Sequence, residues 1–293
     1  MPAGRSASPS PGGPSSCSTD VDFYRDVIMS EPAAAADLPL GAHYHVWTPE
    51  TIAQLWSIWA NNRLLRGQFY PSGYYEALLD EARPYLGTPS VVADIGCGSG
   101  TVLSVLRERR IGARLVGIDL ADASIAALRV RWAGDPSMAF QVGSITSTGL
   151  DDASCDLVVC TETLEHLFPA DFGDGLGEIA RVLTPGGRLL ASVPLEERPN
   201  FVVCPGCHAI FTPYQHMLFN FTIRALGEAL DTRGLEILHV IHPIDTGVPR
   251  RAWKRVLKEW VLRPLFPGVA RRLFRVAGVS GFVAQKRAVA RPA

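Results

Sequence analysis

The ten residues Val91–Gly100, which read VVADIGCGSG, decide the fold of this chain. Their first half is a short apolar run, typical of a buried strand, and their second half is rich in glycine. Glycine lets the backbone turn tightly and lets a ligand approach it closely. The residues that follow, TVLSVLRERR, have the pattern of a helix. The stretch therefore predicts a strand, a tight turn and a helix whose N-terminus faces a ligand.

The rest of the chain continues this alternation of strand-like and helix-like segments. The predicted strands are 90–95, 114–120, 138–142, 155–160, 188–194, 235–241 and 281–288. Strands that alternate with helices form parallel βαβ units. We therefore expect an α/β fold, with a doubly wound, mostly parallel seven-stranded sheet and helices on both of its faces.

Composition divides the chain into three parts. Residues 1–20 are rich in proline, serine and glycine, which predicts a disordered tail. Residues 21–87 predict an N-terminal helical cap, with helices over 48–66 and 72–85. Residues 88–293 predict the main domain, which is compatible with a single core.

Two inserts interrupt the main domain. One spans 195–219, has no helix or strand pattern and contains the sequence CPGCH. The other is a basic helical insert at 250–277, placed before the last strand. Within residues 250–275 there are nine basic residues and one acid, Glu259. Such a basic amphipathic segment predicts contact with an anionic membrane surface or a phosphorylated acceptor. The alternative is a solvated helix that packs its apolar side on the sheet.

Length and charge exclude several function classes. The 293 residues carry a net charge of −1, which gives no general attraction to nucleic acid. Nucleic acid is therefore a less favoured partner, although the basic insert leaves it open. No apolar run reaches the ~20 residues of a membrane span, and the N-terminus lacks the apolar stretch of a secretory signal. The six cysteines form no dense framework. We expect a cytoplasmic protein, peripheral to the membrane if the basic insert binds lipid.

Glycine spacing separates two classes of nucleotide site. A dinucleotide site has the pattern G-x-G-x-x-G, but Thr101 stands where its third glycine would be. Asp94 lies two residues before Gly96, where a negative charge would repel a pyrophosphate and suit an ammonium group. An amino-acid ligand, such as the methionine half of S-adenosylmethionine, fits both features. Asp119, at the end of the second strand, can accept the ribose hydroxyls.

Three motifs together resemble the class I S-adenosylmethionine-dependent methyltransferases. They are DIGCGSG at 94–100, GID at 117–119 and LTPGGRL at 183–189, and the resemblance covers 88–194 and the last two strands. Many members have aspartate where Ser144 stands, and serine accepts the same hydrogen bond more weakly. The resemblance implies that S-adenosylmethionine binds to Asp94, Gly96, Cys97, Gly98, Gly100, Asp119, Leu120, Ser144, Ile145 and Thr161.

A second motif follows the fourth strand. Glu162, Glu165 and His166 lie at helical spacing, so we expect them to share one helical face. Two carboxylates and an imidazole suit a divalent cation, and His216 is a candidate fourth ligand. This E-x-x-E-H string with a later histidine resembles the metal-dependent small-RNA 2′-O-methyltransferases and the ubiquinone-pathway O-methyltransferases. The resemblance implies that Glu162, Glu165, His166 and His216 hold Mg2+ or a similar ion.

The same string also occurs without metal. In that case Glu162 lines the cofactor pocket, and His166 or His216 is the candidate general base. The predicted catalytic residues are Glu162, His166 and His216.

The CPGCH sequence predicts a separate metal site. Cys204, Cys207 and His208 could supply two or three zinc ligands. No second C-x-x-C completes the set, so a metal-free thiol turn is the alternative.

The acceptor is less well defined. Aromatic residues of the N-terminal cap, with 69–75 as a candidate lid, could shape an acceptor pocket. We expect an S-adenosylmethionine-dependent methyltransferase that methylates oxygen on a small-molecule, sugar or lipid-linked metabolite. The alternatives are a metal-independent C- or N-methyltransferase, and a non-catalytic protein that binds S-adenosylmethionine or S-adenosylhomocysteine.

Overall fold

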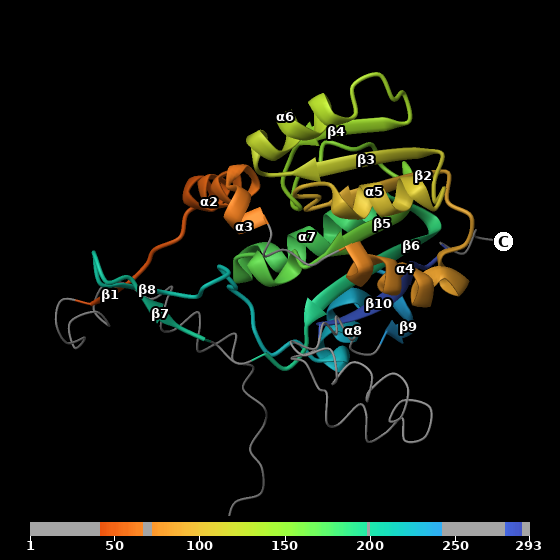
Figure 1. Cartoon of the computed structure of the whole chain (residues 1–293). Helices are drawn as coiled ribbons and strands as arrows, with labels where there is room; N and C mark the ends of the chain where they lie inside the picture. Colours follow the sequence, from red (N-terminus) through yellow and green to blue (C-terminus); the bar gives the residue numbers. More distant parts are fainter. Residues whose placement is uncertain (1–41, 67–71, 198–199, 242–278, 289–293) are drawn as a thin grey trace, which may run out of the picture.

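The fold is described by a computed structural model, shown in Figure 1. The structure describes residues 42–66, 72–197, 200–241 and 279–288. The predicted tail at 1–20 and the predicted basic insert at 250–277 lie outside these residues. So do residues 69–71 of the candidate lid.

A seven-stranded sheet forms the centre of the molecule, with the order β4-β3-β2-β5-β6-β10-β9. Only β10 runs antiparallel to its neighbours, β6 and β9. The predicted doubly wound, mostly parallel sheet is therefore confirmed. Its strands are β2 (Val91–Ile95), β3 (Arg114–Asp119), β4 (Met138–Val142), β5 (Cys155–Thr161), β6 (Leu183–Pro194), β9 (Leu235–Ile241) and β10 (Val279–Lys286).

The strand order fixes where a ligand can bind. β2 pairs with β3 on one side and with β5 on the other, so the chain reverses its direction of winding at β2. In open α/β sheets, ligands bind beyond the carboxyl ends of the strands at this point. The glycine turn after β2 lies there.

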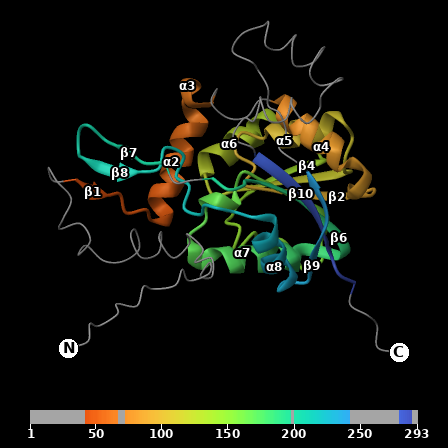
Figure 2. The ribbon, with the colours of Figure 1, turned by 90° about the horizontal axis from the view of Figure 1, so that it is seen from below.

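Helices cover both faces of the sheet, as Figure 2 shows. On one face lie α4 (Ser72–Leu86), α5 (Thr101–Glu108) and α6 (Asp122–Arg131). On the other lie α7 (Pro169–Val182) and α8 (Ile223–Asp231). Each layer buries one apolar stripe because leucine, isoleucine and valine recur at helical spacing.

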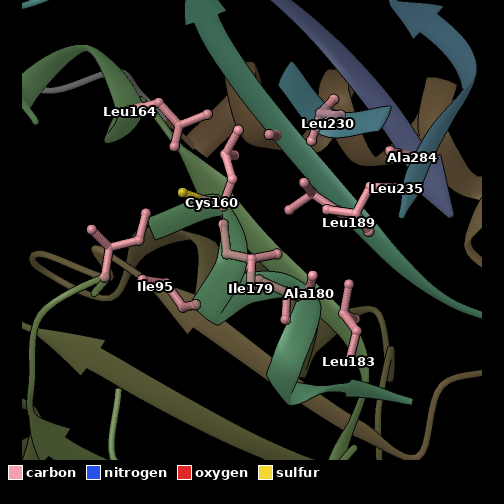
Figure 3. Close-up of a cluster of buried hydrophobic side chains, with 14 of the residues drawn as sticks. Ile95, Cys160, Leu164, Ile179, Ala180, Leu183, Leu189, Leu230, Leu235 and Ala284 are labelled. Atoms are coloured by element: carbon pink, nitrogen blue, oxygen red, sulfur yellow. The ribbon is translucent and has the colours of Figure 1, made fainter. Parts of the chain in front are cut away.

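The core on the α7 face is close-packed. Figure 3 shows Ile179 and Ala180 of α7 against Cys160 of β5 and Leu189 of β6. Leu230 of α8 belongs to the same buried cluster. This packing holds the two central strands rigid, so the carboxyl ends of those strands have fixed positions.

The predicted N-terminal cap is divided between two places. Tyr74, Leu78, Leu79, Ala82 and Leu86 of α4 are buried, and they pack on the sheet with α5 as part of the main core. α4 is therefore packed as a layer of the main core, and the domain bounds stay a prediction. The other described helices of this region, α2 (Pro49–Asn61) and α3 (Arg63–Arg66), lie beyond the ends of the central strands (Figure 1).

The predicted helix over 48–66 begins as expected and breaks once. Thr48 caps α2, and its hydroxyl and that of Thr51 form a capping box. At Asn62 the backbone is extended, and the Asn62 side chain accepts a hydrogen bond from the Leu64 N–H at 2.9 Å. Asparagine thus caps a new short helix and interrupts the old one.

The insert at 195–219 contains structure that its sequence did not indicate. β7 (Val202–Val203) and β8 (Ala209–Phe211) form a hairpin, and β1 (His43–Tyr44) pairs with β8. Strands of two or three residues are too short to give a readable alternation. This small sheet lies apart from the main sheet in both views (Figures 1 and 2).

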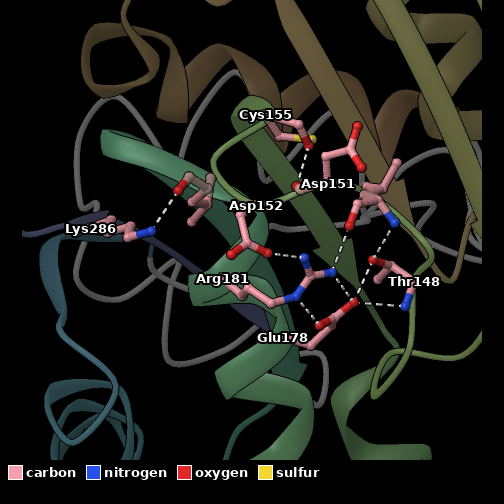
Figure 4. A network of polar contacts seen from close by, with 10 residues as sticks. Thr148, Asp151, Asp152, Cys155, Glu178, Arg181 and Lys286 are labelled. Atoms are coloured by element: carbon pink, nitrogen blue, oxygen red, sulfur yellow. Dashed lines mark hydrogen bonds and ion pairs between the residues drawn. The ribbon is translucent and has the colours of Figure 1, made fainter.

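A charged network ties α7 to the loop after β4, as Figure 4 shows. Arg181 donates to Glu178 at 2.7 Å and to the Leu150 carbonyl at 2.7 Å. Glu178 also accepts from the Thr148 N–H and hydroxyl, at 2.8 and 2.6 Å. These hydrogen bonds lower the pKa of Glu178 to about 2, with the contact to Arg181 as the largest cause.

Replacing Arg181 by methionine should lower the free energy of unfolding by about 1–3 kcal/mol, because charge-assisted bonds to a half-buried carboxylate are lost. The pKa of Glu178 is lowered in the fold, so this stability is complete above pH 4.5 and fades as the pH falls toward 2. Urea unfolding at pH 7 and pH 3 measures both effects. Arg287→Met is the control, since Arg287 pairs with the exposed Asp231 and should change stability by about 1 kcal/mol or less. An equal decrease in the free energy of unfolding in both variants would contradict the structural role of the network.

Candidate functional site

A cavity of about 960 Å3 opens at the carboxyl ends of β2, β3 and β5. Its walls come from the glycine turn, from the loops after β3, β4 and β5, from α2 and from the segment around 214–216. The predicted cofactor and cation residues therefore meet in one space.

The glycine turn is shaped by its backbone. The N–H groups of Gly96 and Cys97 both donate to the Ile118 carbonyl, at 2.8 and 3.0 Å. Gly98 has a φ of +50° and only open space where a side chain would begin. Both Gly96 and Gly98 line the cavity, so the turn presents bare backbone to a ligand, as the sequence predicted.

Asp119 holds this turn in place. One carboxylate oxygen accepts from the Gly98 N–H at 2.7 Å and the other from the Ala121 N–H at 2.8 Å. Burial raises the pKa of Asp119, and these two hydrogen bonds lower it in part. Asp119 lines the cavity and keeps acceptor capacity for the predicted ribose hydroxyls.

Asp94 is a buried carboxyl group in need of a partner. Its side chain is 1% exposed, and its Oδ2 atom has no hydrogen-bond partner. Burial, followed by the charge of Asp119, raises its pKa to about 8. A cationic ligand would stabilise the ionised carboxylate and so offset both the burial and the repulsion from Asp119. The residue therefore fits the predicted ammonium of S-adenosylmethionine.

The other predicted cofactor residues have defined places. All except Asp94 and Gly100 line the cavity. Gly100 instead begins α5 with a φ of +75°, and a Cβ there would lie 2.6 Å from Leu128. At the predicted adenine end, the hydroxyl groups of Ser144 and Thr146 lie 2.8 Å apart.

The segment after β5 is a 3-10 turn, η3 (Leu164–His166), and the expected helical face was wrong. Glu162 precedes the turn with a φ of +50°, which a helix does not accommodate. Its carboxylate accepts from Ser192 at 2.7 Å and from Tyr74 at 3.4 Å. Glu162 is thus held at the cavity wall by its own hydrogen bonds.

The segment around His216 docks on this turn through its backbone. The N–H groups of Met217 and Leu218 both donate to the main-chain oxygen of Glu165, at 2.8 and 3.0 Å. The Gln215 amide donates to the main-chain oxygen of His166 at 3.1 Å. These bonds bring residues 49 or more positions apart side by side, so His216 lies next to the E-x-x-E-H string as predicted.

Glu165, His166 and His216 form a group that could hold a metal ion. One ligand atom from each lies within 4.8 Å of the others. The fourth predicted ligand, Glu162, is not part of this group. Three protein ligands leave coordination positions for solvent or an acceptor, as in catalytic metal sites.

Both histidines in this group are oriented by their Nδ1 atoms. Nδ1 of His166 lies 3.3 Å from the Gln215 carbonyl, and Nδ1 of His216 lies 2.7 Å from a carboxylate oxygen of Glu197. If each Nδ1 carries the proton, each Nε2 presents a lone pair to a metal. Histidines that bind metals have their other nitrogen engaged in this way.

Electrostatics at this end of the cavity favour a cation. Glu165 is 1% exposed, and neither of its carboxylate oxygens has a hydrogen-bond partner. Burial, followed by the charge of Glu162, raises the pKa of Glu165 well above its usual range. Burial, followed by His216, lowers the pKa of His166 to about 3. A divalent ion would stabilise an ionised carboxylate and neutral imidazoles together.

Glu197 was not among the predicted site residues, whereas Trp56 and Trp59 belong to the cap aromatics that were expected to shape an acceptor pocket, and both line the cavity. Glu197 lies in the insert, where no periodicity marks it. The two tryptophans were assigned to a general cap, although their spacing of three residues places them on one side of a helix. That spacing was the one available signal.

The predicted zinc residues lie elsewhere. Cys204 and Cys207 belong to the turn between β7 and β8, and neither they nor His208 line the cavity. Backbone N–H groups of Cys207 and Gly206 lower the pKa of the Cys204 thiol. Zinc at Cys204, Cys207 and His208 stays a prediction.

Comparison with known proteins agrees with this geometry. Residues 93–191 match the family model described as a methyltransferase domain. The matched residues run from the middle of β2 through most of β6, and therefore include the glycine turn and the E-x-x-E-H string.

Two curated relatives illustrate the similarity. A probable S-adenosylmethionine-dependent methyltransferase of Mycolicibacterium smegmatis is 32% identical over 146 residues, 50% of this chain and 52% of that protein. A ubiquinone biosynthesis O-methyltransferase of Paracidovorax citrulli is 35% identical over 99 residues, 33% of this chain and 40% of that protein. The chain thus spans about half or less of the relatives' length.

Solved structures share the fold over a longer part of the chain. One similar structure is a chain of the complex between the Haloferax volcanii Trm112 methyltransferase activator and a methyltransferase. Its TM-score is 0.59 at 22% sequence identity, and the match covers 79% of this chain and 97% of that chain. The Burkholderia thailandensis 1,6-didemethyltoxoflavin-N1-methyltransferase, with S-adenosylhomocysteine bound, has a TM-score of 0.56 and 20% sequence identity. The match covers 84% of this chain and 93% of that chain. At these identities the likeness shows the fold.

Replacing Asp94 by asparagine should weaken binding of S-adenosylmethionine about 10- to 100-fold, because a charged hydrogen bond to the ammonium is lost. The stability of the fold should increase in the same variant, whereas its affinity for the ligand decreases. The pKa of Asp94 is raised in the fold, so its contribution to stability is complete below about pH 4 and is lost as the pH rises through about 8.

Titration calorimetry and thermal unfolding between pH 5 and pH 9 measure the two effects. The variant should gain stability relative to the parent as the pH rises. Asp174→Asn, on the exposed side of α7, is the matched control. Unchanged affinity in Asp94→Asn would contradict the assignment of the ammonium site.

Proposed function

We propose that the protein is an S-adenosylmethionine-dependent methyltransferase that transfers the methyl group to a hydroxyl oxygen of a small molecule with the help of a divalent cation. One observation carries this proposal. The buried, unpartnered carboxylate of Glu165 faces two oriented histidines in the same cavity as the glycine turn. The matched methyltransferase domain supports the donor, and the O-methyltransferase relative agrees with oxygen as the acceptor atom.

The chain's residues would position the methyl donor at one end of the cavity. The Gly96–Gly98 backbone and the α5 N-terminus receive its carboxylate, Asp94 its ammonium and Asp119 its ribose. When bound, S-adenosylmethionine supplies a methyl group on a positively charged sulfur. Transfer forms one O–C bond with an electron pair of the acceptor oxygen and breaks one S–C bond, whose electron pair stays on sulfur. One proton is released from the hydroxyl.

At the other end, Glu165, His166 and His216 would hold the divalent cation. A cation held there would supply Lewis acidity, which would lower the pKa of an acceptor hydroxyl bound to it. Glu197 keeps His216 in the orientation that exposes Nε2. Because both ends open into one cavity, the acceptor oxygen and the methyl carbon can be held close together, which is the main source of rate for such a displacement.

Two alternatives remain distinct in their consequences. A C- or N-methyltransferase without metal would keep its activity in the presence of a chelator. A non-catalytic binding protein would bind S-adenosylmethionine and transfer nothing. The predicted membrane contact of 250–275 falls outside the described residues. Among the described helices, none has the length and apolar character needed to cross a bilayer.

Labelled S-adenosylmethionine identifies the acceptor class. The purified protein is incubated with an extract of the producing cells, with and without chelator, and the label is sorted into lipid, nucleic-acid, protein and small-molecule fractions. We expect label in the small-molecule fraction and its loss on chelation. Transfer that resists chelation would contradict the role of the cation, and bound donor with no label in any fraction would contradict enzymatic activity.

Replacing Glu197 by glutamine should lower the affinity for Mn2+ about 10- to 100-fold, because the carboxylate that orients His216 becomes neutral. Affinity for S-adenosylhomocysteine should not change, since the Glu197 carboxylate contacts His216, which is not one of the predicted cofactor residues. Titration of the protein with Mn2+, followed by electron paramagnetic resonance, measures the first effect. Glu236→Gln, on the exposed side of β9, is the control. Unchanged Mn2+ affinity in Glu197→Gln would show that the ion binds elsewhere.

A further inference from the structure

Five aromatic rings meet at the end of the cavity that holds the cation group. The distances between ring centroids are 4.8 Å from Trp56 to His166, 5.0 Å from His166 to His216 and 6.0 Å from His216 to Tyr214. The ring centroid of Tyr214 lies 6.2 Å from that of Trp59, and the centroid of Trp59 lies 6.0 Å from that of Trp56. All five line the cavity. We call this closed series of ring contacts the aromatic collar.

Three separate elements build the collar. Trp56 and Trp59 project from α2, His166 from η3, and Tyr214 and His216 from the segment after β8. Two of the rings are the candidate cation ligands, so a hydroxyl bound to the cation would lie beside Trp56, Trp59 and Tyr214. Tyr214 is 53% exposed, and a solvent-exposed ring beside a cavity has apolar surface left to bury.

Charge around the cavity excludes one class of acceptor. The described residues that line it include no lysine or arginine. Six of them are acidic, namely Asp119, Glu162, Glu165, Asp171, Glu196 and Glu197. A phosphate or carboxylate placed among them would lose its hydration without gaining a positive partner from these side chains. Among the described lining residues, the side chains therefore favour an uncharged acceptor over an anionic one.

The apolar side chains beside the collar favour an aromatic ring over a sugar as the acceptor. Beside the collar, the cavity is lined by apolar side chains, among them Ile52, Leu167, Phe168 and Leu195. A sugar would bring several hydroxyl groups into this space, and each hydroxyl that faces these apolar side chains rather than a carboxylate costs free energy. An aromatic ring needs a partner only for the hydroxyl that meets the cation, and its faces and edges gain from ring contacts.

We propose that the methyl acceptor is an uncharged hydroxyaromatic compound, whose ring lies within the aromatic collar and whose hydroxyl group points to Glu165, His166 and His216. This inference rests on the proposed function, because it identifies the reacting hydroxyl with the one beside the cation. It selects an aromatic compound from the small-molecule, sugar and lipid-linked acceptors that the sequence left open.

Three probes test the proposal by calorimetry on the full chain with Mg2+ and S-adenosylhomocysteine bound. 2-Naphthol offers a neutral ring with one hydroxyl, 2-naphthyl phosphate offers the same ring with a negative charge, and methyl β-D-glucopyranoside offers neutral hydroxyls without an aromatic ring. We expect 2-naphthol to bind at least about tenfold more tightly than either of the others. Tighter binding of the phosphate or of the glucoside, or binding of S-adenosylhomocysteine without any binding of 2-naphthol, would overturn the proposal.

Variants of the collar locate the bound ring. Tyr214→Leu and Trp59→Leu should each weaken 2-naphthol about 2- to 10-fold, the effect of one lost ring contact, and should leave the affinity for S-adenosylhomocysteine unchanged. Phe201→Leu is the control, since Phe201 is a partly exposed ring on the small sheet that does not line the cavity. Equal effects in all three variants would overturn the proposal.

The two levels of inference fail in different ways. Methyl transfer to a sugar or a phosphate-bearing compound would overturn the choice of acceptor and leave the methyltransferase proposal standing. Absence of S-adenosylhomocysteine binding would remove the proposed function, and with it this inference.

Discussion

Two buried carboxyl groups are the constraint on which the rest of the site depends. Neither oxygen of Glu165 has a hydrogen-bond partner, and Oδ2 of Asp94 has none. Leaving a carboxylate buried and unpaired is costly, and each of these groups would be relieved by a cation. Both belong to one functional region, Asp94 beside the glycine turn and Glu165 beside two histidines. The fold thus provides places for two positive charges, one on a methyl donor and one on a metal ion.

The rigid sheet makes this arrangement possible. β2, β3 and β5 end at the same edge because they are parallel, and the core beneath them is close-packed. Asp119 connects the end of β3 to the glycine turn through two N–H groups. The docking of Met217 and Leu218 on Glu165 adds the third side. Backbone hydrogen bonds therefore position the glycine turn and the turn that carries Glu165, while side chains hold Glu162 and orient His216.

The sequence predicted the features that depend on local pattern. The seven strands, the glycine turn and the Thr48 cap follow from apolar runs, from glycine and from capping chemistry, and all were found. The turn after β5 was missed because the left-handed conformation of Glu162 has no signature in a glutamate. The aromatic collar joins segments about 50 to 160 residues apart in sequence, and Glu197 meets a histidine 19 residues away across an irregular insert. No local pattern reports such meetings. The small sheet was missed because its strands are only two or three residues long.

The most direct test of this account is an anomalous difference map from crystals grown with Mn2+ and S-adenosylhomocysteine. The account predicts one strong peak at about 2.0–2.3 Å from a Glu165 carboxylate oxygen and from Nε2 of His166 and His216, in the same cavity as the bound nucleoside. A map with the nucleoside in place and no peak at these three residues would contradict the cation-assisted transfer on which the account depends.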